Sequence, residues 1–112
     1  GGQMRDFVYV KDCAEVVSWL LKAPRVNGLF NIGTGTARSF MDLASALFRA
    51  LNRPPNVRFV DTPIEIRDKY QYFTEANMSR LRRAGYTRPF ASLEDGVADY
   101  AVNHLNRDDP YR

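Results

Sequence analysis

The sequence has very few of the side chains on which metal, disulfide and thiol chemistry depends. Its 112 residues include one cysteine, Cys13, and one histidine, His104. A single cysteine cannot form an internal disulfide, which fits a reducing compartment, and these two residues are too few for a zinc site. We expect no metal site, and we interpret Cys13 as a small buried side chain, with a reactive thiolate near a helix start as the alternative.

Long apolar runs and a strong excess of one charge are also missing. No run approaches the ~20 apolar residues of a membrane span, and no signal peptide is visible at the start. The formal net charge is +3 with 26% charged residues of both signs, so neither a nucleic-acid nor a membrane partner is expected. The densest basic clusters are Arg80 to Arg83 and Arg49 to Arg58, and the first is interpreted as a solvated helix face. We predict a cytoplasmic protein.

Catalytic pairs are missing as well. No tyrosine is followed four residues later by a lysine, so a Tyr-x-x-x-Lys pair is absent from the sequence. Cys13 and His104 could meet in space, but the sequence offers no third group to orient them. We therefore assign no catalytic residue to this chain.

What is present is enough apolar sequence for one small domain. Hydrophobic residues make up 45% of the chain, which suits a single core rather than two. Strands are predicted where β-branched and aromatic residues cluster. These segments are Phe7–Val10, Leu29–Ile32 and Val57–Val60.

Helices are predicted where apolar residues recur at helical spacing between start and stop signals. Asp12 is expected to cap the first helix, whose apolar face is Val16, Val17, Leu20 and Leu21, and Pro24 to end it. Ser39 with Asp42, and Ser92 with Asp95, resemble capping boxes for two more helices. The last helix is expected to place Tyr100 on its apolar face, in the core. A short helix over 77–84 should end at Gly85. The aperiodic stretch from Asp61 to Thr74 is predicted to be an irregular, functional segment.

The turn Gly33-Thr34-Gly35 imitates part of a dinucleotide-binding fingerprint. It follows an apolar segment and precedes a helix, and amides at a helix start can bind a pyrophosphate. However, Arg38 stands where the third glycine should be, and the helix begins only at Ser39. We therefore favour a structural turn and assign no cofactor-binding residue to this chain.

Two residues are candidates for substrate binding. Arg5 precedes an apolar strand, where its planar guanidinium could bind a phosphate through two hydrogen bonds. A salt bridge to Asp6 or Asp12 is the alternative. Tyr70 lies in the aperiodic segment, where a ring with a hydroxyl could pack on a sugar or base, and core packing is its alternative.

The order of these motifs carries a family resemblance. The matching stretches are Arg5–Val10 with Asp12, Phe30–Gly35, Ser39-Phe40, Tyr70-Gln71 with Thr74 and Ala76, Ala84-Gly85-Tyr86 with Pro89-Phe90, Gly96-Val97 with Tyr100, and Leu105-Asn106-Arg107-Asp108. Together they resemble the C-terminal portion of extended short-chain dehydrogenase/reductase enzymes of the NAD-dependent epimerase/dehydratase family. One departure is Asn77, where such enzymes often carry Asp, and it is expected to affect a helix cap more than substrate choice.

The resemblance implies an α/β fold of Rossmann type, of which this chain would be a C-terminal fragment. Residues 12–36 would form one helix–strand unit that packs on the nucleotide-binding sheet. Residues 1–11 and 37–112 would belong to the substrate-binding part. The glycine-rich loop for NADP and the catalytic Tyr/Lys pair would lie upstream of this segment.

The resemblance also implies roles for individual residues. Arg5 matches an arginine that contacts the nucleotide diphosphate, and Tyr70 matches a tyrosine that contacts the substrate. The implied activity is epimerisation of a nucleotide sugar with NADP, by an enzyme that is a homo-oligomer, and this chain alone would be inactive. A related dehydratase or 4-epimerase, or a non-catalytic nucleotide-sugar- or protein-binding module, remains the alternative.

Overall fold

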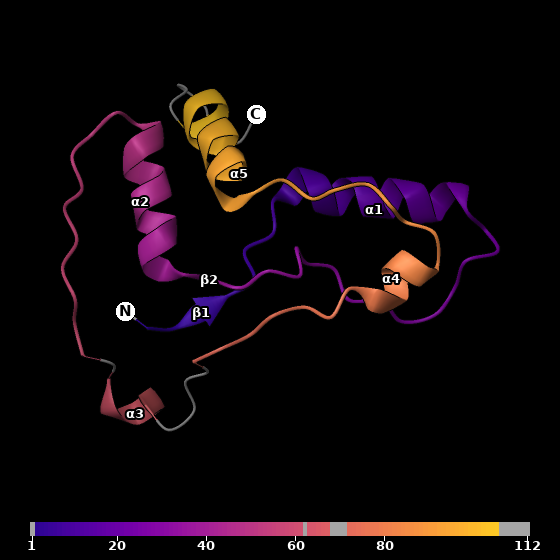
Figure 1. The fold of residues 1–112 in the computed structure, drawn as a ribbon, viewed down its shortest axis with the longest axis horizontal. Helices are drawn as coiled ribbons and strands as arrows, with labels where there is room; N and C mark the ends of the chain where they lie inside the picture. The colour runs from indigo at the N-terminus through magenta and orange to yellow at the C-terminus, as the bar shows by residue number, and fades with distance from the viewer. Residues whose placement is uncertain (1, 62, 68–71, 106–112) are drawn as a thin grey trace.

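The computed structural model describes residues 2–61, 63–67 and 72–105. Its elements in chain order are β1 (Met4–Arg5), α1 (Val10–Lys22), β2 (Arg38–Ser39), α2 (Phe40–Ala50), α3 (Ile64–Arg67), α4 (Ser79–Arg83), α5 (Leu93–Tyr100) and the π-helix η1 (Ala101–Leu105). Figure 1 shows two groups, α1 with α4 and α2 with α5, and the short β1–β2 pair lies near the place where the groups meet. The described part is therefore rich in helix, with one antiparallel two-stranded sheet.

The first strand and the first helix both begin earlier than predicted. The strand is Met4–Arg5 rather than Phe7–Val10, and α1 already begins at Val10 after Tyr9, which makes no side-chain cap bond. Asp12 is therefore not the cap. It lies in the first helical turn, where a negative charge suits the helix dipole, and its Oδ2 accepts a hydrogen bond from the Ala91 amide at 2.8 Å.

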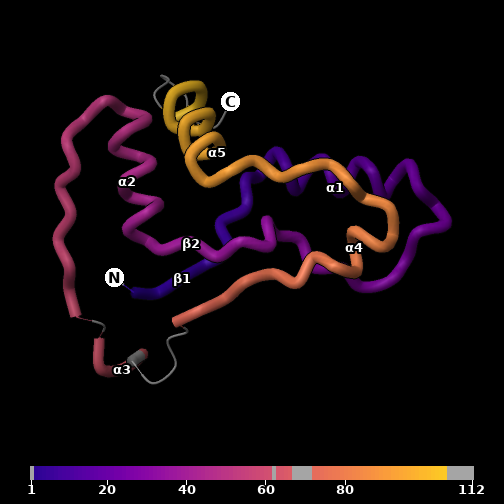
Figure 2. The backbone as a smooth tube through the Cα atoms, viewed as in Figure 1, coloured from indigo at the N-terminus to yellow at the C-terminus, as the bar shows by residue number. Residues whose placement is uncertain are grey.

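The predicted strands Leu29–Ile32 and Val57–Val60 are wrong as well, because neither segment is assigned to a strand. A strand requires a hydrogen-bonding neighbour as well as suitable side chains. Instead, Leu29 is 80% exposed and Val60 is 79% exposed. Figure 2 shows the chain between α2 and α3 passing along the outer edge of the molecule.

The main core forms between the inner face of α1 and the chain around α4. Val16 and Leu81 are fully buried, and Tyr86 is nearly so. Trp19 packs against Tyr86 in an edge-to-face arrangement with 5.4 Å between ring centroids. The predicted apolar face of α1 is thus divided, because Val16 is buried here whereas Leu21, on the same predicted face, is 80% exposed.

Helix α4 ends as its sequence predicts. Gly85 has φ +115°, the Gly85 amide donates to Arg82, and the Tyr86 amide donates to Leu81, which is the bond pattern of a Schellman motif. Before the helix, Asn77 Oδ1 accepts from the Ser79 amide at 3.1 Å, as expected for a residue that affects a helix cap.

The basic cluster of α4 is only partly a solvated face. Arg82 donates to the backbone carbonyls of Tyr86 and Arg88. Its guanidinium also lies over the rings of Tyr86 and Phe90, 5.8 and 5.2 Å from their centroids. Arg82 therefore covers the core, while Arg80 and Arg83 are exposed.

Helices α2 and α5 pack against each other in a second cluster. The capping box predicted at Ser39 and Asp42 is confirmed, and Ser92 accepts a hydrogen bond from the Asp95 amide. Small buried residues, Ala46 and Ala101, allow the close packing. Tyr100, which its helical spacing assigns to the core, is 43% exposed.

The described molecule is open for its size. It exposes 8569 Å², whereas a compact monomer of 12.8 kDa exposes about 6300 Å². Its principal extents are 48 × 39 × 21 Å. Within the described ranges, no helix combines the length and the apolar character that crossing a membrane requires.

Candidate substrate-binding site

Arg5 lies in β1, one of the two strands of the sheet. Its register partner in β2 is Arg38. The Nη1 of Arg5 donates to the Met4 carbonyl at 2.8 Å, and the guanidinium carbon lies 5.9 Å from the centroid of the Phe40 ring. Phe40 begins α2, so the arginine side chain extends along the start of that helix.

A segment from much later in the sequence runs along the other edge of β1. The Met4 amide donates to the Tyr72 carbonyl at 2.7 Å, and the Thr74 amide donates to the Met4 carbonyl at 3.1 Å. Met4 also forms a parallel bridge with Phe73. These bonds place residues 72–74 beside the strand that carries Arg5. The other predicted site residue, Tyr70, lies outside the described residues.

Asp6, immediately after β1, connects three segments through one carboxylate. Oδ1 accepts from the Thr34 amide at 2.8 Å and from the Thr34 hydroxyl. Oδ2 accepts from the amides of Gly35, at 2.9 Å, and Ala76, at 3.1 Å. Partial burial acts to raise the pKa of Asp6, but these hydrogen bonds stabilise the charged form more, so that pKa lies below its usual value.

These bonds bear on the two interpretations of the glycine turn. Two of the amides that could have bound a phosphate, those of Thr34 and Gly35, donate to the Asp6 carboxylate instead. The turn is also tightly packed, because a Cβ at Gly33 would lie 2.6 Å from both Ala76 Cβ and Asp6 Oδ2. The occupied amides and the close packing favour the structural-turn interpretation.

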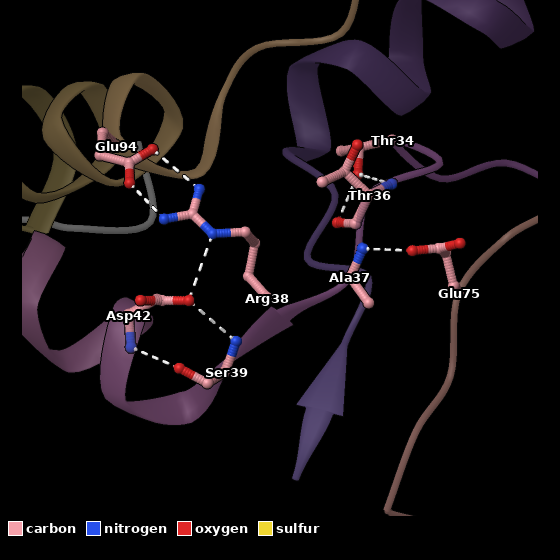
Figure 3. Close-up of polar contacts among 8 residues, drawn as sticks. All are labelled: Thr34, Thr36, Ala37, Arg38, Ser39, Asp42, Glu75 and Glu94. Atoms are coloured by element: carbon pink, nitrogen blue, oxygen red, sulfur yellow. Dashed lines mark hydrogen bonds and ion pairs between the residues drawn. The ribbon is translucent and has the colours of Figure 1, made fainter. Parts of the chain in front are cut away.

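Arg38 joins the starts of helices α2 and α5 (Figure 3). Its Nη2 and Nη1 donate to the two carboxylate oxygens of Glu94 at 2.5 and 3.1 Å, and its Nε donates to Asp42 at 3.3 Å. Hydrogen bonding to Glu94 raises the pKa of Arg38, and the same contact lowers the pKa of Glu94. Beside them, Glu75 accepts from the Ala37 amide at 2.8 Å.

Asp99 of α5 makes a comparable connection to the start of α1. Its carboxylate accepts from Lys11 at 2.8 Å, from Asn103 at 2.7 Å and from the Tyr9 hydroxyl. The hydrogen bonds from Lys11 and Tyr9 lower the pKa of Asp99, whereas burial and this carboxylate raise the pKa of Tyr9. This cluster holds α5 against α1.

The cysteine and the histidine of this chain have different surroundings. Burial, with the nearby Asp12 charge, raises the pKa of the Cys13 thiol, which argues against a reactive thiolate. His104 Nε2 lies 3.9 Å from Asp99 Oδ2. In the part of the chain that the structure describes, no group of three or more His, Cys, Asp or Glu side chains could hold a metal ion.

Two hollows lie near this site. A mostly apolar groove of ≈ 440 Å³ is lined by residues 7–10, by Leu43 of α2, and by residues of α5 that include Gly96 and Tyr100. A smaller hollow of ≈ 220 Å³ is lined by Gln3, Phe40, Met41 and residues 57–60. The Phe40 ring therefore connects the smaller hollow to Arg5.

The sequence indicates Arg5 as a binding candidate, a role that stays a prediction, but it does not reveal the contacts of Asp6 and Arg38. From the sequence, Asp6 is only a possible partner of Arg5, and Arg38 is only a departure from a glycine pattern. A signal for Asp6 was available, because the amides of a Gly-Thr-Gly turn seek an anion, which can be an internal carboxylate as well as a phosphate.

Comparison with known proteins shows which proteins this chain resembles in sequence. No family model matches the chain. The chain is 55% identical over 111 residues to proteins of two strains of Nitratidesulfovibrio vulgaris, DP4 and Hildenborough. It is 45% identical over 117 aligned positions to a protein of Fusobacterium nucleatum subsp. nucleatum. Each alignment covers 99% of this chain. The chain is therefore a homologue of bacterial epimerases.

The relatives share one name, ADP-L-glycero-D-manno-heptose-6-epimerase. This chain corresponds to a C-terminal portion of them. It spans about a third of their length, 34% of the two Nitratidesulfovibrio proteins and 35% of the Fusobacterium protein. The resemblance to epimerases that the motifs indicated is thereby confirmed.

Proposed function

We propose that this chain acts as the substrate-binding portion of an NADP-dependent nucleotide-sugar epimerase. The favoured reaction interconverts ADP-D-glycero-D-manno-heptose and ADP-L-glycero-D-manno-heptose at C6″. The observation that carries this proposal is the 45–55% identity to proteins of that name over 99% of the chain. Arg5 lies in the strand between β2 and the segment 72–74, and it is the main residue proposed to bind the substrate.

Arg5 is proposed to bind the diphosphate of the substrate. A guanidinium offers paired N–H donors in a plane, which matches two phosphate oxygens, and such charge-assisted bonds are among the strongest that side chains make. Its position supports this role, because strand pairing on both sides of Met4 holds the backbone next to Arg5 and the ring of Phe40 lies beside the guanidinium.

Tyr70 is proposed to contact the sugar or the base from the adjacent segment. Its support is that Tyr72, the second residue after Tyr70 in the sequence, is hydrogen bonded to the residue before Arg5. A tyrosine ring can pack against an apolar face while its hydroxyl forms a hydrogen bond.

NADP is the proposed cofactor, and it would supply the removal and return of hydride. The described residues do not fit a site for its phosphates, because the glycine-turn amides are bonded to Asp6. The sequence also has no Tyr-x-x-x-Lys pair. We therefore propose that NADP is bound mainly by other parts of a longer enzyme and that the 112-residue chain alone is inactive. Isothermal titration of this chain with NADP would check the binding, and a turnover assay would check the activity.

The similarity leaves open the alternative functions, the domain organisation, the oligomeric state and the location in the cell, which are proposals as well. A nucleotide-sugar 4-epimerase or dehydratase, or a non-catalytic nucleotide-sugar- or protein-binding module, is the alternative function. Residues 12–36 are proposed to pack on a Rossmann-type sheet, with residues 1–11 and 37–112 in the substrate-binding part. A homo-oligomeric enzyme in the cytoplasm stays a prediction.

The test uses the complete gene product, which is the protein encoded by the whole reading frame that contains this sequence. Arg5→Ala should weaken binding of the ADP-heptose by roughly 1.5–3 kcal/mol, because a charge-assisted contact to the diphosphate is lost. Arg5→Lys should recover only part of the affinity, since a lysine cannot donate in the same planar pair. Isothermal titration measures both, and the Kd for NADP should change less.

Arg88→Ala is the matched control. Arg88 is exposed and ion paired to Glu15 of α1, and it does not belong to the β1–β2 sheet. It should leave the Kd of the ADP-heptose unchanged. An Arg5→Ala protein with the Kd of the unmodified protein would reject the assignment of Arg5, and turnover of a different nucleotide sugar would favour the alternative enzyme.

A further inference from the structure

We infer that Asp6 is a positioning residue that fixes the register of the Arg5 strand and aligns it with the segment that follows Tyr70. This inference rests on the proposed function of Arg5 and Tyr70. Asp6 itself is assigned no contact with substrate. Its carboxylate instead holds three parts of the chain in one arrangement, namely the end of β1, the glycine turn and the residue Ala76.

The geometry of an extended chain separates the roles of Arg5 and Asp6. Successive side chains point to opposite faces. Arg5 contacts the ring of Phe40, whereas Asp6 contacts the glycine turn and Ala76. Asp6 therefore anchors the strand from the face that Arg5 does not use.

Register matters here because β1 has only two residues. A shift of one residue would exchange the faces, so the side chain at position 5 would turn away from Phe40. So short a strand has few ladder bonds to prevent such a shift. The four hydrogen bonds to the Asp6 carboxylate supply the missing restraint.

The same carboxylate also restrains the segment after Tyr70. Residues 72–74 bond to the backbone of Met4, and Ala76 then bonds to the side chain of Asp6. Two successive attachments to one short strand define the direction of this segment. Close packing of Gly33 against both Ala76 and Asp6 leaves little room for another arrangement.

The experiment is a double-mutant cycle in the complete gene product, with an ADP-heptose as the titrated probe. Asp6→Asn keeps the side-chain size but removes the charge and one acceptor oxygen. It should raise the Kd for the ADP-heptose about tenfold and leave the Kd for NADP unchanged. The double variant Arg5→Ala/Asp6→Asn should bind no more weakly than Arg5→Ala alone, because Asp6 acts through Arg5.

Asp12→Asn is the matched structural control. Asp12 also accepts a hydrogen bond from a distant backbone amide, that of Ala91 at 2.8 Å, but on the side of α1 and α5. It should lower the melting temperature without changing the Kd. Thr34→Val removes the hydroxyl bonds to Asp6 and Thr36 but keeps the bond from the Thr34 amide to Asp6. It is the milder variant if Asp6→Asn does not fold, and it should raise the Kd by a smaller factor.

The outcomes separate this inference from the proposed function. If Arg5→Ala weakens binding while Asp6→Asn and Thr34→Val only lower the melting temperature, the positioning role is overturned and the function of Arg5 stands. Additive losses in the double variant would also overturn it. If Arg5→Ala itself leaves binding unchanged, the proposed function fails, and the inference fails with it.

Discussion

A carboxylate that accepts four hydrogen bonds stabilises the fold most when it is ionised, and at the scale of single residues Asp6 is the prime example. Its folded pKa lies below the usual value. A lowered folded pKa means that the stabilisation is present above the unfolded pKa of about 3.9 and is lost as the pH falls through the folded pKa. Asp42 and Glu94, whose pKa values are also lowered, add to the same trend.

We therefore predict that the chain loses stability as the pH falls from 5 towards 2 (an approximate range) and that Asp6→Asn reduces this dependence. The asparagine has no charge to lose, so part of the acid sensitivity should disappear along with part of the stability at neutral pH. Thermal melts across this pH range, with exchange of the Gly35 and Ala76 amides as a local probe, measure the effect. An unchanged pH dependence in Asp6→Asn would contradict the assignment.

At the scale of elements, the two helix clusters differ in how completely they are buried. Leu81 of α4 is fully buried against Val16 of α1, whereas Tyr100 of α5 is 43% exposed. Tyr100 lines the apolar groove beside residues 7–10. The difference arises from what lies beside each residue. Leu81 packs in the core with Val16 of α1, whereas Tyr100 lines an open groove.

We predict that Leu81→Ala is much more damaging than Tyr100→Ala. Truncation of a buried leucine costs about 2–5 kcal/mol through lost burial and a residual cavity. Tyr100→Ala should cost less than about 1.5 kcal/mol, since much of the ring is already in water. Thermal melts of the complete gene product compare the two. Equal losses would mean that Tyr100 is covered in the complete protein and that its helical spacing had indicated its burial correctly.

At the scale of the whole molecule, the described chain leaves large apolar side chains in water. Val17 is 52% exposed, and Leu21 and Leu29 are each 80% exposed. They lie within residues 12–36, the unit proposed to pack on a nucleotide-binding sheet. Uncovered apolar faces favour association, and the segment 29–32, which belongs to no strand of this structure, could pair with another chain.

We predict that the 112-residue chain, expressed alone, associates with itself or has a free energy of unfolding below about 5 kcal/mol. Leu21→Lys should reduce the association, because it places a charge on the exposed face. Lys22→Ala, a neighbouring change that removes no apolar surface, is the control. Sedimentation equilibrium with denaturant melts measures both properties, and a compact, stable monomer would favour the stand-alone binding module.

Local features of this fold could be predicted from the sequence because they depend on residues close together in the chain. The capping box joins Ser39 to Asp42, three residues away, and Gly85 ends α4 through its own backbone freedom. Helices α1 and α2 were likewise expected from their apolar spacing. Arg5 was found as a candidate because its residue type and position match a family pattern, and its role in binding stays a prediction.

Only the tertiary structure decided which distant groups meet. Asp6 bonds to Thr34, 28 residues away, and to Ala76, 70 residues away. The sequence shows a carboxylate and a glycine turn, but several anions could satisfy those amides. The predicted strands Leu29–Ile32 and Val57–Val60 are unformed for a related reason. Side-chain preference is local, whereas a strand exists only where another backbone supplies its hydrogen bonds.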